Sequence, residues 1–291
     1  MVMLVTGGTG FLGNRLVKRL IERGENVRVA TRKGIAINGA EVLRGDLSDP
    51  SFVNRAVRGA DGVFHLATNS DHFASRHDHN GAGETAWARN VLAAAEKEGA
   101  KAVHMSSAAV KARNKTNYSL AKEEAEKVAV EFGKSFAVPI IRASLIYDQN
   151  VLRKLARASW LPFPYKRQRI HLAYRETVVD ALLGAMRNGK SKVYEVGDRA
   201  PVLLTDFYRA LAHPRPMLWI PPQAVWLGIA AAYPVGWAAR LAGVRPPITP
   251  SFIRYAFEHR DLDTRLAEKE LGYEPVDTLD MVHAFKQGRL S

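Results

Sequence analysis

Four side chains near the middle of the chain have the types and spacing for acid–base chemistry. Tyr118 and Lys122 are four residues apart in NYSLAK, so on a helix they lie on one face. Ser106 and Ser107 end the apolar segment just before that helix. A tyrosine has a pKa near ~10, so it exchanges protons poorly at neutral pH unless a cation such as Lys122 stabilises its phenolate. A lone Tyr-x-x-x-Lys pair is more commonly a solvated helix face, so other motifs must decide.

A glycine-rich segment near the start of the chain is the second chemical feature. The sequence VTGGTGFLG (residues 5–13) fits both G-x-G-x-x-G and T-G-x-x-G-x-x-G. Such glycines allow a tight turn and let backbone N–H groups at a helix N-terminus approach a pyrophosphate. A strand, a helix and a second strand surround it within about 30 residues, which predicts a dinucleotide site rather than an ordinary turn. The residues expected to contact the cofactor here are Gly7, Gly10, Phe11, Leu12 and Gly13.

The residues after the second strand indicate which dinucleotide binds. Sites that prefer NAD place Asp or Glu about 20 residues past the glycines, where it bonds the ribose 2′-hydroxyl. Here Arg32 and Lys33 stand in that region without a carboxylate, which favours a 2′-phosphate. We therefore predict NADP as the cofactor, with NAD as the alternative. The other interpretation of Arg32 and Lys33 is a solvated basic turn. In GDLSDP, Asp49 before Pro50 is a good helix N-cap, which leaves Asp46 for another task.

The elements that must position these residues alternate between strand and helix. This alternation predicts an α/β fold with a doubly wound parallel sheet, whose ligands bind at the carboxyl ends of the strands. The strands are expected at Val2 to Thr6, Asn26 to Thr31, Ala40 to Arg44, Gly62 to Ala67, Lys101 to Ser106 and Val138 to Ala143, and the helices at Phe11 to Arg23, Pro50 to Arg58, Glu84 to Glu98 and Tyr118 to Phe132.

Composition narrows the classes of function. The 291 residues are 47% hydrophobic, enough for a substantial core, and contain no cysteine, which excludes disulfides and thiolate catalysis. The net charge of +13 suits anionic ligands, and since no nucleic-acid motif is found, an anionic cofactor and a small-molecule substrate explain it best. The chain begins with its first strand, so no signal peptide and a cytoplasmic location are expected. A homodimer is an open alternative.

Together these motifs resemble the short-chain dehydrogenase/reductase superfamily, in its extended branch of NAD-dependent epimerases and dehydratases. The segments that carry the resemblance are Thr6 to Gly13, GDL at Asp46, HLA at His65 to Ala67, the serine pair, YSLAK at Tyr118 to Lys122, and LGYEP at Leu271 to Pro275. The resemblance implies a Rossmann domain and a smaller, mostly helical C-terminal substrate domain. It also implies cofactor contacts by Asp46, Leu47, Leu66, Ala67, Ser106, Tyr118 and Lys122.

The family also implies a role for each reactive side chain. Tyr118 would protonate a carbonyl oxygen as hydride arrives, or deprotonate an alcohol in reverse. Lys122 would bond the nicotinamide ribose, and Ser107, selected over Ser106 by the SAAV match, would hold the substrate oxygen. The sequence departs from the family at Glu84, where Asn is usual, and at Lys111, where Tyr is usual.

Three functions fit this pattern. The first is an NADP-dependent ketone or alcohol oxidoreductase, the second a nucleotide-sugar epimerase or dehydratase that retains its cofactor, and the third a non-catalytic nucleotide-binding subunit. The intact Tyr118 and Lys122 count against the third. The 11 positions from Ser107 to Tyr118 are fewer than in nucleotide-sugar epimerases, which favours a reductase.

The second half of the sequence is less specific. We expect residues 1–150 to form the nucleotide domain, to which residues of about 168–197 also belong. Residues 151–167 and 198–291 are expected to form a domain that caps the substrate. This part of the chain loosely resembles dihydroflavonol reductase-like and hopanoid-associated proteins. Residues 151–170 are basic and without a carboxylate, which fits either a diphosphate site or a basic surface. The uncharged run Ile220 to Ala239 contains three prolines and is expected to line the pocket; peripheral membrane contact is an alternative that we do not predict. In SDHFASRHDHN, His72 or His77 would contact substrate, and no metal is predicted.

Overall fold

The computed structural model describes residues 1–68, 82–157, 168–211 and 261–290, together with 224, 227, 230 and 258. Its centre is a seven-stranded parallel sheet in the order β10-β6-β5-β4-β1-β2-β3. The order reverses at β1, which confirms the predicted doubly wound α/β sheet. The strands are β1 (Val2–Thr6), β2 (Asn26–Thr31), β3 (Ala40–Arg44), β4 (Gly62–His65), β5 (Lys101–Ser107), β6 (Ile140–Ala143) and β10 (Val193–Val196).

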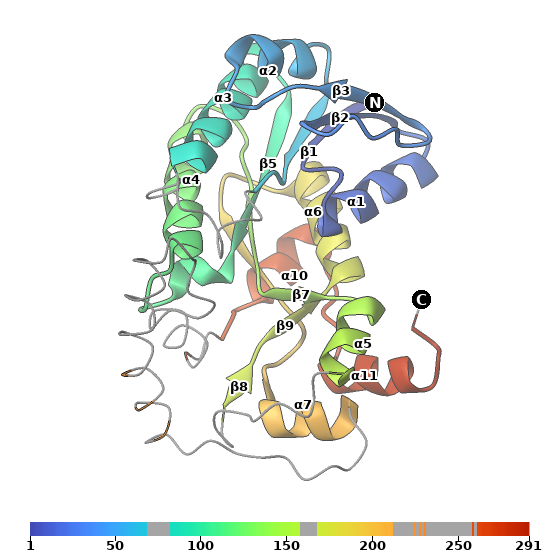
Figure 1. Cartoon of the computed structure of the whole chain (residues 1–291). Helices are drawn as coiled ribbons and strands as arrows, with labels where there is room; N and C mark the ends of the chain where they lie inside the picture. The colour runs from blue at the N-terminus through green and yellow to red at the C-terminus, as the bar shows by residue number, and fades with distance from the viewer. Residues whose placement is uncertain are drawn as a thin grey trace, which may run out of the picture.

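Helices cover both faces of this sheet (Figure 1). On one face lie α1 (Phe11–Glu22), α6 (Arg175–Asn188) and α10 (Arg265–Leu271), and on the other α2 (Pro50–Val57), α3 (Ala82–Glu98) and α4 (Asn117–Phe132). Successive residues of β1 show why two cores form. Met3 and Val5 pack into the first cluster and Leu4 into the second, because side chains alternate across a strand.

Local signals account for where several elements begin. Asp49 caps α2 by accepting a hydrogen bond from the backbone N–H of Ser51, with Pro at the first helical position, as predicted. Thr116 and Ser119 form a capping box at the start of α4, which sets the first turn that carries Tyr118. The strand β4 ends at His65, two residues earlier than the apolar pattern predicted.

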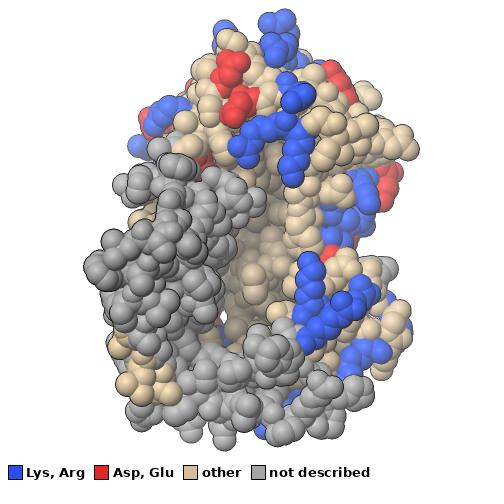
Figure 2. All heavy atoms as spheres, in the orientation of Figure 1, with Lys and Arg blue, Asp and Glu red and all other residues tan. Residues whose placement is uncertain are grey.

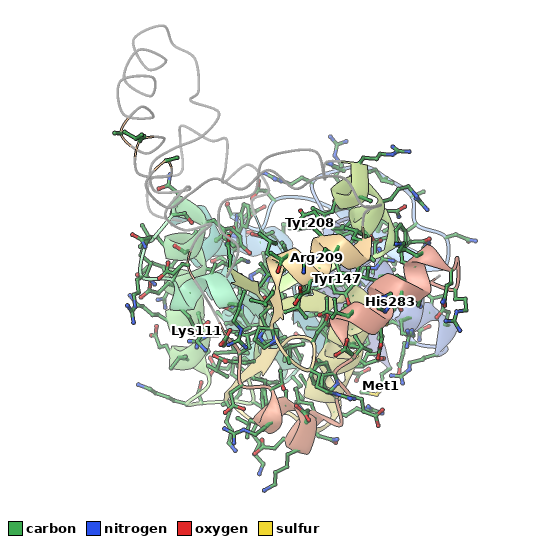
Figure 3. The ribbon with its side chains drawn as sticks, turned by 90° about the horizontal axis from the view of Figure 1, so that it is seen from below. Met1, Lys111, Tyr147, Tyr208, Arg209 and His283 are labelled. Atoms are coloured by element: carbon green, nitrogen blue, oxygen red, sulfur yellow. The ribbon has the colours of Figure 1, made fainter. Side chains whose placement is uncertain are left out.

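A third, smaller hydrophobic cluster lies away from the main sheet. It is built from β7 (Leu145–Tyr147), β9 (Leu172–Tyr174), α5 (Gln149–Arg157), α7 (Leu204–Leu211) and α11 (Thr278–Lys286); β8 (Arg169–Ile170) pairs antiparallel with β11 (Val202–Leu203) nearby. Figure 3 places Tyr147 between α7, which carries Tyr208, and α11, which carries His283. The buried carboxylate of Asp198 accepts the hydroxyl of Tyr147 at 2.8 Å and that of Thr278 at 2.6 Å.

This arrangement places the second half of the chain in two regions. Residues 193–196 add a strand to the main sheet, and α6 packs against α1, whereas α5, α7 and α11 share the third cluster. The division into a nucleotide domain and a capping domain stays a prediction. Within the described ranges, no helix is both long and apolar enough to cross a bilayer. The loop with His72, His77 and His79, and the run Ile220 to Ala239 except residues 224, 227 and 230, lie outside the described residues.

Candidate active site

The glycine turn joins β1 to α1 at the carboxyl edge of the sheet. Gly7 has a φ of +73°, and a Cβ there would lie 2.8 Å from the backbone nitrogen of Ala67. A Cβ on Gly13 would lie 2.8 Å from the carbonyl carbon of Gly7. Both positions therefore require glycine for packing within the protein itself. The segment HLA contributes to this packing, because the N–H of Ala67 and the N–H of Leu66 both bond to Thr6.

Gly10 is different, because the protein alone does not demand it. A Cβ on Gly10 would approach only the carbonyl oxygen of Gly7, at 3.2 Å, and the residue is exposed. It is the N-cap of α1, and no side chain caps that helix. The backbone N–H groups in the first turn of α1, which begins with Phe11 and Leu12, can therefore bind an anion, and the anion can approach the backbone closely because Gly10 has no side chain. This turn fits the pyrophosphate of a dinucleotide.

The residues predicted to select the cofactor, Arg32 and Lys33, follow β2, and the predicted cofactor contacts Asp46 and Leu47 follow β3. Arg32 is exposed and its guanidinium lies 5.5 Å from the ring centre of Trp87 on α3, a cation–π contact. Asp46 accepts the backbone N–H of Ser48 at 2.8 Å, and the carbonyl of Leu47 accepts the side chain of Asn90. Lys33 follows in an exposed turn. The structure thus brings Arg32 and the GDL segment to the same edge of the sheet, beside α3.

The predicted catalytic side chains come from β5 and α4. Ser107 is the last residue of β5, and its hydroxyl accepts the N–H of Ala109 at 3.2 Å in the short 3-10 helix 108–111. Tyr118 is half-buried in the first turn of α4, and Lys122 lies one turn further along the same face. Lys122 is only 4% exposed, so its ammonium needs a partner inside the protein.

That partner is Glu84, which the sequence singled out only as a departure from the family. Its carboxylate lies 3.3 Å from the Lys122 amine and is 2% exposed. The same carboxylate accepts the hydroxyl of Thr68 at 2.7 Å. Glu84 enters from the first turn of α3, a neighbour of α4, so the pair spans the two helices that cover this face of the sheet. The signal available in the sequence was a carboxylate at the start of an otherwise apolar helix face.

Two buried histidines adjoin this ion pair. The rings of His65 and His104 are 5.4 Å apart, and His65 Nδ1 lies 2.8 Å from the hydroxyl of Thr6. Burial, and then the charge of Lys122, lower the pKa of His65 to about 3. Burial, His65 and Lys122 lower the pKa of His104 well below its ordinary value. Both rings are therefore neutral at physiological pH and add no charge beside Lys122.

The structure separates the two serines. Ser106 points to the opposite side of β5 from Ser107, because neighbouring side chains alternate, and its hydroxyl donates to Glu126 at 2.5 Å. Glu126 is in turn bound by Arg142. The side chain of Ser106 is therefore occupied in a buried polar network. The predicted cofactor contact of Ser106 stays a prediction, and the backbone is the part of the residue left to make it.

The face shown in Figure 2 is hollowed at its centre. Lys and Arg atoms gather above the hollow and again at its lower edge, over α5. Two separate basic regions therefore border one depression.

Comparison with known proteins agrees with this architecture. A doubly wound sheet with a glycine turn at its first strand is typical of NAD(P)-dependent enzymes of the short-chain dehydrogenase/reductase type, and this chain is such an enzyme. It belongs to the NAD dependent epimerase/dehydratase family, whose model matches residues 3–197. The family and the fold predicted from the sequence are thereby confirmed.

Individual relatives are more distant. The chain is 33% identical over 156 residues to 2-alkyl-3-oxoalkanoate reductase of Stenotrophomonas maltophilia, a match that covers 52% of this chain and 46% of the relative. It is 25% identical over 304 residues to 4-hydroxy-2-methyl-3-oxo-4-farnesyl-3,4-dihydroquinoline-1-oxide ketoreductase of Stigmatella aurantiaca, covering 92% and 90%. The crystal structure of gox2253 superposes with a TM-score of 0.74 at 23% identity, covering 100% of this chain and 99% of that one, and supports the fold alone.

Proposed function

We propose that this chain is an NADP-dependent oxidoreductase that interconverts a ketone and a secondary alcohol. The observation that carries the proposal is the buried cation of Lys122 one helical turn from half-buried Tyr118, on the helix that follows Ser107. This constellation lies at the carboxyl edge of a parallel sheet whose first strand leads into the glycine turn. A tyrosine beside a fixed cation is what proton transfer to or from a substrate oxygen requires.

Each side chain has a defined task. Ser107 orients the reacting oxygen, Tyr118 donates its phenolic proton to that oxygen or removes it in reverse, and Lys122 stabilises the phenolate. The nicotinamide, when bound, supplies or accepts the hydride. Glu84 keeps Lys122 in place between α3 and α4.

The preference for NADP is supported at the other end of the cofactor site. Arg32 and Lys33 provide two exposed cations after β2, and the contact with Trp87 limits the orientations of the Arg32 guanidinium. A planar guanidinium can bind a 2′-phosphate through two hydrogen bonds. We expect wild-type protein to bind NADPH more tightly than NADH, and Arg32→Asp to reverse that order in a fluorescence titration. Tighter binding of NADH by the wild-type chain would contradict the assignment.

A ketone substrate is supported by the names of the two relatives, which describe reduction of oxo groups. The short connection from Ser107 to Tyr118 also favours a reductase over a nucleotide-sugar epimerase, the second candidate. The two differ in how they treat the cofactor, since an epimerase regenerates it within one cycle and often retains it. Nicotinamide absorbance in freshly purified protein would favour the epimerase.

The test is single-turnover hydride transfer on any accepted ketone, followed by NADPH absorbance with cofactor saturating. Tyr118→Phe should fold and bind NADPH while transfer slows by about 10² to 10⁴-fold, the range for loss of a general acid. Ser107→Ala should slow transfer, whereas the neighbouring Ser106→Ala, whose hydroxyl faces Glu126, serves as the matched control. Wild-type rates in Tyr118→Phe would overturn the proposed mechanism.

A further inference from the structure

The connection from Ser107 to Tyr118 joins two of the proposed catalytic residues. Ser107 ends β5 and caps the short 3-10 helix 108–111, and Thr116 caps α4, whose first turn holds Tyr118. Residues 112–115, between the two caps, belong to no helix or strand. The conformation of this stretch therefore sets the distance and the angle at which Ser107 and Tyr118 face a reacting oxygen.

A carboxylate from the C-terminal part of the chain binds this connection. One oxygen of Glu258 accepts the backbone N–H of Arg113 at 2.5 Å, and the other accepts that of Asn114 at 3.1 Å. Two successive N–H groups that lie outside any helix or strand thus share one acceptor. Because the acceptor is ionised, these hydrogen bonds are stronger than bonds between neutral groups.

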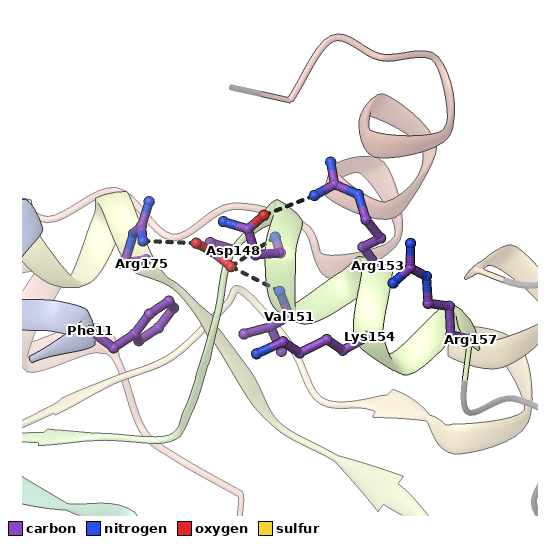
Figure 4. Close-up of a pocket in the computed structure, with 8 residues that line it drawn as sticks. Phe11, Asp148, Val151, Arg153, Lys154, Arg157 and Arg175 are labelled. Carbon is purple, nitrogen blue, oxygen red and sulfur yellow. Dashed lines mark hydrogen bonds and ion pairs between the residues drawn. The ribbon is translucent and has the colours of Figure 1, made fainter.

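A similar contact at the start of α5 shows what is unusual about Glu258 (Figure 4). Asp148 accepts the N–H groups of Asn150 and Val151 at 2.9 Å each. Asp148 directly precedes α5, so it acts as an ordinary local cap of that helix. Glu258 instead lies 145 positions from Arg113, so its hydrogen bonds hold two distant segments of the chain together.

Lys111, labelled in Figure 3, makes a second link to the same region. Its amine donates to the backbone carbonyl of Asp261 and to the carboxylate of Glu195 on β10, each at 2.9 Å. The same oxygen of Glu195 accepts the N–H of Asp263 at 2.8 Å. A tyrosine, which is usual in the family at position 111, has a single hydroxyl hydrogen and could not donate to both acceptors. This departure from the family therefore adds a contact that the usual residue cannot make.

The segment that Lys111 binds is itself fixed to the body of the protein. The N–H of Leu262 donates to Nδ1 of buried His171 at 3.1 Å, so the proton of that ring lies on Nε2, which donates to the carbonyl of Asp198 at 2.7 Å. Helix α10 follows a few residues later and packs on α6. The connection is thus tied to an anchored support.

Resting on the proposed oxidoreductase function, we propose that Glu258 and Lys111 are positioning residues that hold the connection 108–116 in the conformation that aligns Ser107 with Tyr118. Neither side chain takes part in the proton transfer, and both act through the connection. A misplacement of about 1 Å can slow a reaction by about 10²-fold. A loosened connection should therefore slow hydride transfer while cofactor binding is kept.

The first arm of the experiment measures the connection itself, in the full chain with NADPH bound. Hydrogen–deuterium exchange is followed by mass spectrometry in peptides that contain residues 108–117. Glu258→Ala should speed exchange at Arg113 and Asn114 by at least about ten-fold, because their N–H groups lose their acceptor. Glu96→Ala, which removes an exposed carboxylate at the end of α3, is the matched control and should leave the exchange unchanged.

The second arm measures single-turnover hydride transfer with ketone and NADPH saturating. Glu258→Ala should slow transfer by about 10 to 10²-fold, while the KM for the ketone and the dissociation constant of NADPH stay within about two-fold of wild type. Glu258→Gln keeps one carbonyl oxygen and should recover part of the rate. Lys111→Met, at an exposed position, should slow transfer by about five-fold and replaces Glu258→Ala if that variant does not fold. Its control is Lys97→Met.

The two arms separate the possible failures. Unchanged exchange in Glu258→Ala would overturn the proposal, and so would a loosened connection that transfers hydride at the wild-type rate. A raised KM for the ketone with an unchanged rate at saturation would place Glu258 in substrate binding instead. If the wild-type chain reduced no ketone, the proposed function would be refuted and the positioning role with it. The exchange data would still decide whether Glu258 holds the connection.

Discussion

Two buried glutamates meet cations beside α4, and the two pairs are built differently. Glu126 is bound by Arg142 through a planar guanidinium, with Nε at 2.9 Å, and also accepts the hydroxyl of Ser106. This contact raises the pKa of Arg142. Glu84 instead meets the single amine of Lys122, at 3.3 Å. Lys122 and Glu126 lie one turn apart on α4, so the two buried ion pairs are neighbours on the same helix.

The difference lies in what each cation can do besides pairing. A guanidinium fork that binds a carboxylate through two nitrogens is fixed in orientation, so the Glu126 pair joins α4 to β6 and has little freedom to change partner. An ammonium is a point charge with three rotatable donors on a flexible stem. Lys122 can keep Glu84 and still serve a phenolate or a ribose. We infer that one pair supports the fold and the other supports the chemistry.

The largest expected effect separates these two roles directly. Lys122→Ala should lower turnover by about 10² to 10⁴-fold, because Tyr118 loses its cation, and should weaken cofactor binding. Arg142→Ala should leave turnover per folded molecule near the wild-type value. Both are measured as NADPH-dependent hydride transfer with the folded fraction determined by circular dichroism. Equal losses of turnover in the two variants would remove the distinction.

Arg142→Ala should instead reduce stability. It strands the buried carboxylate of Glu126, and removing one partner of such a pair costs about 3 kcal/mol, the lower end of the range because the arginine is partly exposed. Urea unfolding monitored by far-UV circular dichroism measures the change. Glu124→Gln, at an exposed surface pair with Lys127, is the control and should change stability by less than about 1 kcal/mol.

A smaller effect is expected when the charge of Glu84 is removed but its shape is kept. Its carboxylate offsets part of the positive field of Lys122, so Glu84→Gln should favour the phenolate of Tyr118. Alcohol oxidation requires that phenolate, so kcat for oxidation at pH 7, measured with NADP saturating, should rise by roughly two- to ten-fold. Glu126→Gln should leave this rate unchanged; if both variants changed it equally, Glu84 would have no specific influence on the site.

The smallest expected effect concerns acid stability, because two buried histidines, His65 and His104, adjoin the Lys122 pair. The folded-state pKa values of His65 and His104 lie below the ordinary 6.5. The unfolded chain therefore binds more protons, and stability falls as the pH drops below about 6.5. His104→Leu removes one of the two groups that bind an extra proton in the unfolded chain. The loss of folding stability on acidification should therefore be smaller by up to about 1.4 kcal/mol per pH unit. Neither ring nitrogen of His104 has a hydrogen-bond partner among the described residues, so stability at pH 7 should be kept.

Urea unfolding between pH 7 and pH 5 measures this slope. His283→Leu, on the exposed side of α11, is the control and should follow the wild-type curve. An unchanged slope in His104→Leu would show that the acid sensitivity arises elsewhere.

The sequence by itself determined the order and type of the elements around the site. The predicted strands and helices agree with β1 to β6 and α1 to α4 to within about two residues at each end, because apolar period, glycines and caps act over a few neighbouring residues. The capping carboxylate of Asp49 and the glycine turn were predictable for the same reason. The alternation along β5 could also have shown that Ser106 and Ser107 point to opposite sides.

Only the tertiary structure decided which distant side chains meet. Glu84 and Lys122 are 38 positions apart and come together because α3 packs on α4; Arg175 and Phe11 meet because α6 packs on α1. These contacts depend on how helices dock on a shared sheet, which no local pattern encodes. A buried charge is tolerated only where such docking supplies its partner. The motifs thus name Tyr118, Lys122 and Ser107, while packing determines that Lys122 is held by a carboxylate and that Ser106 belongs to a different network.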